Sequence, residues 1–204
     1  MEQYEFEEKF YSRNPDGVLE RLKELTIGIA GAGGLGSNIA ASLVRAGVQQ
    51  FIIADFDRIE YSNLNRQFFF PDQVGQYKVD ALKENLLRIN PFVKIKTFSG
   101  MVMPENIKLL YDKADIMVEA FDHAEMKAMI VHNWLALHRD RYIVTATGLA
   151  GFGNSNAMQV ETRGKVVICG DRESSPDTSG LTAPRVAIAA AMQANAVVEI
   201  AMSS

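Results

Sequence analysis

A glycine-rich turn is the first stretch of the sequence whose residue types and spacing could do chemistry. Residues 31–36 read GAGGLG and follow an apolar run. In a strand–turn–helix setting, Gly31 permits a tight turn, Gly33 lets the backbone approach a phosphate, and Gly36 lets the helix pack closely on the strand. The unpaired N–H groups at the helix start add a partial positive charge. The turn, with Gly34 inside it, therefore predicts a nucleotide site.

A carboxylate stands where the ribose of that nucleotide would lie. Asp55 ends a second apolar run, 19 residues after Gly36, and a carboxylate at this place can accept hydrogen bonds from both ribose hydroxyls. The pattern does not say which nucleotide binds, because an NAD(P)-dependent oxidoreductase uses the same turn and the same acid. Such an enzyme would have no need of Mg²⁺, and it stays open as an alternative.

The loop after Asp55 favours triphosphate chemistry over hydride transfer. Residues 56–67 are dense in polar side chains, and Lys78 follows at the next helical segment. An enzyme that cleaves a triphosphate needs fixed cations, because charge builds on the bridging oxygen. Arg66 can hold phosphate oxygens in a bidentate fork, and Lys78 can act as a point charge.

A candidate magnesium ligand, Asp122, follows the apolar run 115–120. Mg²⁺ on nucleotide phosphates keeps several waters and takes one or two protein oxygens, and Asp122 is the best placed carboxylate for that role. The alternative is that Asp122 caps the helix that follows. Cys169 is the only cysteine, so we expect no cysteine-based zinc site. It ends an apolar run, which is typical of a small buried hydrophobe, with a redox or thioester role as the alternative.

The elements that must position these residues alternate between strands and helices. Apolar runs typical of strands lie at residues 25–30, 51–55, 94–100, 115–120 and 142–147, with two more strands expected within 157–170. Segments typical of helices lie at 35–46, 73–90, 104–111, 124–138 and 182–202. The alternation predicts an α/β fold with a Rossmann-like, doubly wound, mostly parallel sheet and appended antiparallel strands. We expect residues 1–20 to form an N-terminal arm and residues 21–204 a single nucleotide-binding domain.

Charge and composition exclude several classes of protein. The chain has 204 residues and a formal net charge of −4 at pH 7, which argues against binding nucleic acid through bulk attraction to phosphate. No window approaches 18 uninterrupted apolar residues, and the acidic start is unlike a signal peptide. We expect a cytoplasmic protein that binds neither nucleic acid nor a membrane.

Four stretches together resemble the ThiF/MoeB/HesA family, the bacterial relatives of ubiquitin-activating enzymes, over roughly residues 20–202. They are GAGGLG, DFDRIEYSNLNRQ, VGQYKVDALKENLLRINP and EAFDHAEMKA, of which SNLNRQ is the most specific. Within the family, the chain is most similar to the short ThiF-type proteins of thiamine biosynthesis. Family members bind ATP and Mg²⁺ and adenylylate the C-terminal glycine of a small ubiquitin-like carrier, with release of pyrophosphate. The resemblance implies the same reaction here, on a ThiS-type sulfur carrier.

The resemblance also implies roles for particular residues. It places the glycine turn under the phosphates, Asp55 on the ribose and Asp122 beside Mg²⁺. The other residues expected to bind the nucleotide are Asp57, Asn63, Arg66, Gln67 and Lys78. Arg66, Lys78 and Asp122 are expected to be catalytic. Family dimers insert an arginine from the partner's N-terminal arm, so the resemblance implies a homodimer with Arg13 in that role. Many relatives hold a structural zinc in two C-x-x-C pairs, which this sequence lacks.

The resemblance leaves the substrate open between several alternatives. They are a carrier of the MoaD type, the C-terminus of a peptide, or no substrate at all in a non-catalytic partner subunit. The polar loop 171–180 could admit the carrier tail, and the glycine-rich loop 147–153 could form one wall of its channel.

Overall fold

One seven-stranded sheet organises the residues that the computed structural model describes, 2–203. Its strands are β1 (Thr26–Ala30), β2 (Gln50–Ala54), β3 (Lys94–Phe98), β4 (Ile116–Glu119), β5 (Ile143–Ala146), β6 (Gln159–Arg163) and β7 (Val166–Gly170). They lie in the order β3-β2-β1-β4-β5-β7-β6, and all neighbours pair in parallel except β6 and β7. The structure confirms the predicted Rossmann-like α/β sheet with an antiparallel pair at one edge.

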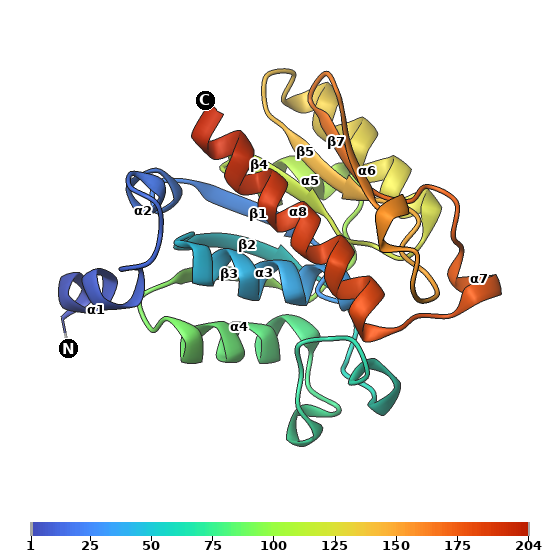
Figure 1. The fold of residues 1–204 in the computed structure, drawn as a ribbon, viewed down its shortest axis with the longest axis horizontal. Coiled ribbons are helices and arrows are strands. Elements are labelled where there is room, and N and C mark those ends of the chain that lie inside the picture. Colours follow the sequence, from blue (N-terminus) through green and yellow to red (C-terminus); the bar gives the residue numbers. More distant parts are fainter. Residues whose placement is uncertain (1, 204) are drawn as a thin grey trace.

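Helices cover both faces of the sheet (Figure 1). On one face lie α3 (Gly34–Ala46), α4 (Lys78–Ile89) and α8 (Ala183–Ser203), and on the other α5 (Pro104–Tyr111) and α6 (Ala124–Leu137). The remaining helices are α1 (Gln3–Phe10), α2 (Val18–Leu22) and the short α7 (Pro176–Ser179), with 3₁₀ turns η1 (Tyr61–Asn63), η2 (Pro71–Gln73) and η3 (Ser155–Ala157). The division into an arm and a single domain stays a prediction.

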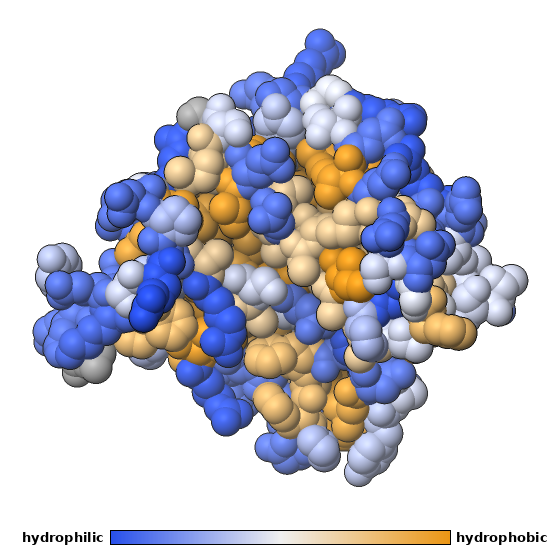
Figure 2. All heavy atoms as spheres, viewed as in Figure 1, coloured by the Kyte–Doolittle hydropathy of each residue, from blue (hydrophilic) through white to orange (hydrophobic). Residues whose placement is uncertain are grey.

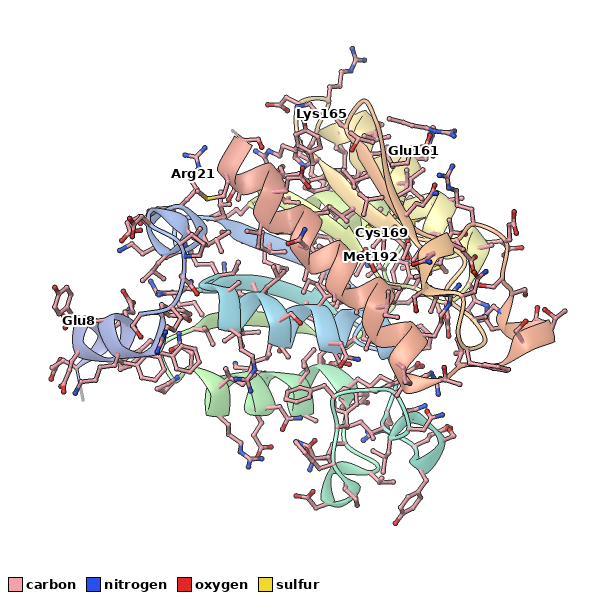
Figure 3. All side chains as sticks on the ribbon, viewed as in Figure 1. Glu8, Arg21, Glu161, Lys165, Cys169 and Met192 are labelled. Carbon is pink, nitrogen blue, oxygen red and sulfur yellow. The ribbon has the colours of Figure 1, made fainter. Side chains whose placement is uncertain are left out.

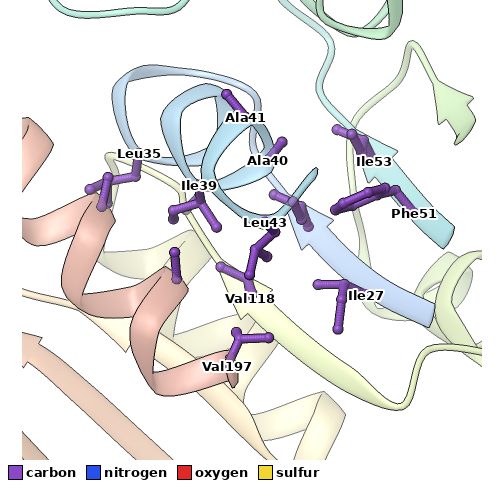
Figure 4. Close-up of a cluster of buried hydrophobic side chains, with 14 of the residues drawn as sticks. Ile27, Leu35, Ile39, Ala40, Ala41, Leu43, Phe51, Ile53, Val118 and Val197 are labelled. Carbon is purple, nitrogen blue, oxygen red and sulfur yellow. The ribbon is translucent and has the colours of Figure 1, made fainter. Parts of the chain in front are cut away.

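The two faces of the sheet carry different side chains, because successive residues of a strand point to opposite sides. Ile27 and Ile29 of β1 belong to the larger core cluster, which Figure 4 shows between the sheet, α3 and α8. Gly28 points to the other face, where a Cβ would lie 3.0 Å from the ring of Tyr111 on α5. The small residue therefore lets α5 approach the sheet, and α6 adds the fully buried Trp134 to the same face.

The topology gathers three loops at one edge of the sheet. β1 lies between β2 and β4, so the connections leaving β1 and β3 run to opposite sides. In open α/β sheets, ligands bind at the carboxyl ends of the strands at such a switch point. The loops that follow Ala30, Ala54 and Glu119 meet there, and they carry the glycine turn, the polar loop and Asp122.

One predicted helix begins later than its pattern indicates. The sequence predicts a helix over 73–90, whereas α4 begins at Lys78. Gly75 takes a φ of +90°, which ends any helical run from η2. The backbone N–H of Lys78 donates to the carbonyl of Asp57 at 2.9 Å, and this bond fixes the helix start beside the loop after β2. The predicted start is therefore wrong, and the predicted end is close to Ile89.

Helix α8 has the length and apolar composition of a membrane-spanning helix. It packs along α3 and covers β5 and β7, and inner residues such as Val186 and Val197 belong to the main core. Its outer face exposes Ala187, Ala191 and Met202 beside the polar Asn195 and Glu199, and Figure 2 shows apolar side chains gathered along this helix. Core packing explains the inner face and leaves the outer face uncovered within residues 2–203.

Candidate functional site

The glycine turn has the close contacts that demand glycine at two positions. Gly31 has a φ of +101°, and a Cβ there would lie 2.6 Å from the carbonyl oxygen of Ala120, just after β4. A Cβ on Gly36 would lie 1.9 Å from the carbonyl oxygen of Gly31. Gly33 and Gly34 have more room and face the polar loop after β2. The turn thus leaves the start of α3 open toward that loop.

Two polar residues of α3 hold the polar loop against the glycine turn. Asn38 Nδ2 donates to the carbonyl of Arg66 at 2.9 Å. Ser37 Oγ donates to the carbonyl of Gly33 at 2.6 Å and accepts from the N–H of Phe68 at 3.0 Å. The sequence analysis does not predict a role for either residue. The feature that could have indicated one is a pair of adjacent polar side chains near the start of an apolar helix.

Arg66 lies over the glycine turn with its guanidinium exposed. Its aliphatic part lies 3.6 Å from the position of a Cβ on Gly34. Nη1 donates to the carbonyl of Ser62 at 3.0 Å and to Oδ1 of Asn65 at 2.8 Å. Arg66 belongs to none of the ion pairs among residues 2–203. Its charge is therefore available to an anionic ligand.

Gln67 contributes a buried acceptor that the described chain leaves unpaired. The residue is buried, Oε1 has no hydrogen-bond partner, and Nε2 lies 3.7 Å from the position of a Cβ on Gly33. An unsatisfied buried polar atom costs about 1–3 kcal/mol. A donor from a bound nucleotide or an ordered water would remove that cost, so Gln67 fits a nucleotide site.

Asp55 is buried and is held by two backbone groups. Its Oδ2 accepts from the N–H of Ala32 at 2.6 Å, and its Oδ1 accepts from the N–H of Asp57 at 2.8 Å. Burial raises the pKa of Asp55, and these hydrogen bonds and the charge of Lys78 oppose part of the rise. Because each carboxylate oxygen has further lone pairs, Asp55 can brace the glycine turn and still accept hydrogen bonds from a ribose.

Lys78 and Asp57 form an ion pair beside Asp55. Nζ of Lys78 lies 2.6 Å from Oδ2 of Asp57, and the exposed fractions of the two side chains are 8% and 46%. The aliphatic part of the Lys78 side chain is therefore buried at the edge of the sheet. The carboxylate of Asp57 orients its ammonium group. Direct contact of either residue with a nucleotide stays a prediction.

Asn63 shapes the polar loop. Its Oδ1 accepts from the N–H of Glu60 at 3.0 Å, and its own N–H donates to the carbonyl of Glu60 at 3.0 Å. These bonds form the turn η1, which precedes Arg66. The side-chain N–H₂ group has no part in them, so the predicted contact of Asn63 with the nucleotide stays open.

Asp122 follows the peptide that contacts Gly31, and its side chain is 90% exposed. Nε2 of His123 lies 3.7 Å from its Oδ1. His123 is the N-cap residue of α6, and no side chain caps that helix. The capping alternative for Asp122 is therefore wrong.

The carboxylate of Asp122 fits a metal ion that a nucleotide brings with it. Among residues 2–203, no group of three or more His, Cys, Asp or Glu side chains could hold a metal. A magnesium ion on phosphates needs one or two protein oxygens, and Asp122 can supply them. The expected lack of zinc stays a prediction.

Arg13 lies at the opposite edge of the sheet from the glycine turn. Tyr11 Oη donates to the carbonyl of Val44 at 2.8 Å, and Asn14 Nδ2 donates to that of Ala46 at 2.7 Å. These bonds hold the arm at the C-terminal end of α3, about 20 Å from the glycine turn at 1.5 Å per residue. Arg13 therefore cannot reach the site of its own chain, and its predicted role requires a second copy.

Cys169 is a core residue on β7, where α8 covers the sheet (Figure 3). Burial raises the pKa of its thiol to about 12. The thiol is therefore protonated at neutral pH and lacks the thiolate that reactive cysteines use. The structure confirms the interpretation of a small buried hydrophobe.

Two buried ion pairs lie at the carboxyl edge, and the sequence predicted neither. Glu119 ends β4 and pairs with Lys127 of α6 at 3.0 Å. Asp171 follows β7 and pairs with Arg185 in the first turn of α8. Charged residues are mostly exposed unless they are paired. The burial of the Glu119, Asp171 and Arg185 side chains, and the partial burial of Lys127, could therefore be found only from the fold.

A cavity of about 370 Å³ opens beside the second pair. Its lining residues are Phe152, Gly153, Ser155, Thr182, Pro184, Arg185 and Ile188. Phe152 is 86% exposed, and Arg185 Nη1 donates to the carbonyl of Gly153 at 2.9 Å. Val186 lies 3.1 Å from the position of a Cβ on Gly34. The start of α8 therefore contacts both the glycine turn and the cavity beside the loop 147–153, through different residues.

Comparisons with solved structures show the same fold. TcdA, the E. coli tRNA N6-threonylcarbamoyladenosine dehydratase, was solved in complex with ATP. It has a TM-score of 0.84 and 20% identity, over 98% of this chain and 94% of that one. E. coli MccB with ATP has a TM-score of 0.70 and 23% identity, over 90% of this chain and 57% of that one. Likeness at this identity shows the fold alone.

Comparisons by sequence point to one family. Ubiquitin-like modifier-activating enzyme 5 of Drosophila willistoni is 47% identical over 78 residues, 38% of this chain and 19% of that protein. The enzyme of the same name from Caenorhabditis briggsae is 30% identical over 159 residues, 72% of this chain and 36% of that protein. The chain thus spans about a fifth to a third of these relatives. Neither is a ThiS adenylyltransferase, so that narrower resemblance stays a prediction. The sequence model of the ThiF family matches residues 7–203, and the chain therefore belongs to the ThiF family.

Proposed function

We propose that this protein is an ATP-dependent adenylyltransferase that activates a carboxyl terminus. The observation that carries the proposal is that Arg66 and Gln67 lie against a glycine turn that opens a helix, in a ThiF-family chain. Lys78 lies near Asp55, whose carboxylate binds the backbone of that turn. The turn alone would also fit an oxidoreductase. The two cations beside it are what a polyphosphate requires, and the likeness to two structures solved with ATP supports this choice of nucleotide.

The proposed reaction needs no general base. A terminal carboxylate is ionised at neutral pH, and its oxygen attacks the α-phosphorus of ATP. The bond from that phosphorus to the bridging oxygen breaks, and pyrophosphate leaves with the electron pair. Two anions must approach each other, so Arg66 and Lys78 lower the repulsion between them. Mg²⁺ held by Asp122 and the phosphates would neutralise further charge.

As the substrate we propose a ubiquitin-like sulfur carrier of the ThiS type. Relatives named ubiquitin-like modifier-activating enzymes support a ubiquitin-like protein, and the choice of ThiS rests on the resemblance in sequence. An extended tail that ends in glycines would suit the cavity beside the loop 147–153. A role in thiamine biosynthesis and a cytoplasmic location belong to the same proposal.

We further propose a homodimer that forms through the outer face of α8. Two-fold dimers use the same patch on both chains, and the outer face of this 21-residue helix exposes Ala187, Ala191 and Met202 around Asn195 and Glu199. Arg21 Nε donates to the carbonyl of Ala201 at 2.9 Å. Arg21 directly follows the N-terminal arm, so this bond places the end of the arm near the C-terminal end of α8. If the two helices pack antiparallel, that end comes over the start of the other α8, beside the glycine turn. Arg13 of the partner subunit would then reach the site.

Intact-mass spectrometry tests the proposed reaction. We would incubate the protein with ATP, Mg²⁺ and one of three acyl substrates: a ThiS-type carrier, a MoaD-type carrier, or a short peptide with a free C-terminus. We expect one AMP to be added to the ThiS-type carrier and none to a carrier without its last glycine. Transfer to another substrate would correct the choice of carrier. No adduct on any substrate would contradict the proposed function and favour a non-catalytic subunit.

A further inference from the structure

Glu119 is a fully buried carboxylate that the proposed reaction does not use. It accepts four hydrogen bonds at the end of β4. Oε1 accepts from the N–H of Phe121 at 2.6 Å and from Nζ of Lys127 at 3.0 Å. Oε2 accepts from the same Nζ at 3.0 Å and from Oγ1 of Thr145. The carboxylate is therefore fully engaged by three elements of the fold.

The same network ties the turn after β4 to its neighbours. Nζ of Lys127, on α6, also donates to the carbonyl of Ala146, the last residue of β5, at 3.0 Å. Gln193 Nε2, on α8, donates to the backbone carbonyl of Glu119 at 2.9 Å and to that of Val144 at 3.3 Å. Strands β4 and β5 and helices α6 and α8 thus meet at Glu119.

A buried ion pair is a poor means of stabilising a fold. Removing two charges from water costs free energy that their attraction repays only in part, and apolar residues of similar volume often serve as well. A pair with this many directed bonds is better suited to fixing a geometry. The geometry in question is that of the turn 120–123, which begins α6 without a side-chain cap.

Two parts of the candidate site rest on this turn. A Cβ on Gly31 would lie 2.6 Å from the carbonyl oxygen of Ala120 and 3.3 Å from the nitrogen of Phe121. The glycine turn therefore lies against the very peptide whose N–H Glu119 binds. Asp122 is the next residue along the chain, and its side chain is exposed. Within residues 2–203, no hydrogen bond orients this side chain, and its nearest charged partner is Nε2 of His123 at 3.7 Å.

We propose that Glu119, paired with Lys127, is a positioning residue. It fixes the positions of Asp122 and of the glycine turn at the carboxyl edge of the sheet. The inference rests on the proposed function, because only that function supplies a nucleotide with a bound Mg²⁺ that Asp122 can bind. Glu119 itself is fully buried, so it would act through this turn and not by direct contact with a ligand. Its loss should weaken the contribution of Mg²⁺ to ATP binding more than it weakens binding of ATP alone.

Calorimetric titration with ATP, with and without Mg²⁺, tests this on four single variants and one double variant. In Glu119→Gln and Lys127→Met we expect the gain in ATP affinity that Mg²⁺ provides to fall about tenfold, to the level of Asp122→Asn. Lys127→Arg keeps the charge and should retain the gain within about twofold. In the double variant Glu119→Gln/Asp122→Asn, the first substitution should add less than about twofold, because it acts through Asp122.

A matched control separates positioning from general loss of stability. Arg185→Met breaks the other buried ion pair, so it should lower the melting temperature as Glu119→Gln does but leave the Mg²⁺ gain unchanged. Equal Mg²⁺ gains in folded Glu119→Gln and the wild type would overturn the inference and leave the proposed function standing. A wild type that binds no ATP would overturn the proposed function, and the inference with it. Should Glu119→Gln fail to fold, Thr145→Val removes one of its donors and should lower the gain by about twofold; no change there would also overturn the inference.

Discussion

The two halves of the carboxyl edge are built in different ways. At the ends of β1 and β2, polar side chains are buried and paired, with Asp55 under the glycine turn and Lys78 bound to Asp57. At the ends of β5 and β7, the edge consists of long loops around an apolar cavity, with Phe152 exposed. The first half suits a ligand of constant shape and high charge. The second offers apolar surface that would suit a less charged partner.

Both halves contain a buried ion pair near the site, and the two pairs serve different loops. Glu119 and Lys127 hold the turn that carries Asp122, on the nucleotide side. Arg185 joins Asp171 to the carbonyls of Gly153 and Asn154, on the cavity side. Substitutions in the two regions should therefore separate effects on ATP from effects on the acyl substrate.

The largest effect should come from Arg66→Ala on the nucleotide side. Adenylate formation should fall by about 100-fold or more, a loss of about 2.7 kcal/mol of transition-state stabilisation, with every acyl substrate. Initial rates of pyrophosphate release measure this. Arg163→Ala, an exposed arginine on β6, is the control and should leave the rate unchanged. A rate near that of the wild type in Arg66→Ala would remove this residue from the mechanism.

Two glycines contrast the halves at the level of the backbone. Gly153→Ala places a side chain at φ +64° in open space, which should cost about 1–2 kcal/mol of stability and leave ATP binding intact. Gly31→Ala adds a clash with the carbonyl of Ala120 to the same kind of strain. It should destabilise the protein more and weaken ATP binding about tenfold. Urea unfolding measures the stability of the two variants, and calorimetry measures their affinity for ATP. Equal losses of ATP affinity in both variants would contradict the expected difference between the two halves.

On the cavity side, Phe152→Ala should raise the KM for the carrier about fivefold, since about 1 kcal/mol of apolar contact is lost. The KM for ATP should stay the same. Leu109→Ala is the matched control, because Leu109 is 85% exposed but lies on α5, away from the edge. A change in the KM for ATP, with none for the carrier, would reverse the assignment of the two halves.

The smallest effect concerns the buried thiol of Cys169 on β7, in the half that contains the cavity. Burial raises the pKa of Cys169 to about 12 from a reference value of 9.0. The unfolded chain therefore loses its thiol proton first as the pH rises, and the free energy of unfolding should fall between about pH 9 and pH 12. In Cys169→Ala this fall should be shallower, measured by urea unfolding at several pH values. An unchanged slope would show that other groups, such as the buried Tyr11 with its raised pKa, account for it.

The nucleotide half could be largely predicted from the sequence, because its signals are local. The strand–turn–helix pattern places Gly31 and Asp55 correctly on the fold, and alternation of strands and helices gives the parallel sheet. The predicted start of α4 is wrong, because the spacing of apolar residues carries no information on the left-handed conformation of Gly75. Glu119 could not be found, because burial of an acid depends on Lys127 and Thr145 arriving from other elements. The position of Arg13 likewise follows from where Tyr11 docks.

The account depends on activation of a carboxyl terminus by ATP, and exchange of labelled pyrophosphate into ATP tests that step most directly. With Mg²⁺ and a carrier that ends in Gly-Gly, we predict exchange that requires both the carrier and its last glycine. Exchange should be lost in Arg66→Ala while the variant stays folded. ATP binding without exchange, for every carrier and peptide tried, would contradict the account and make the protein a nucleotide-binding partner subunit.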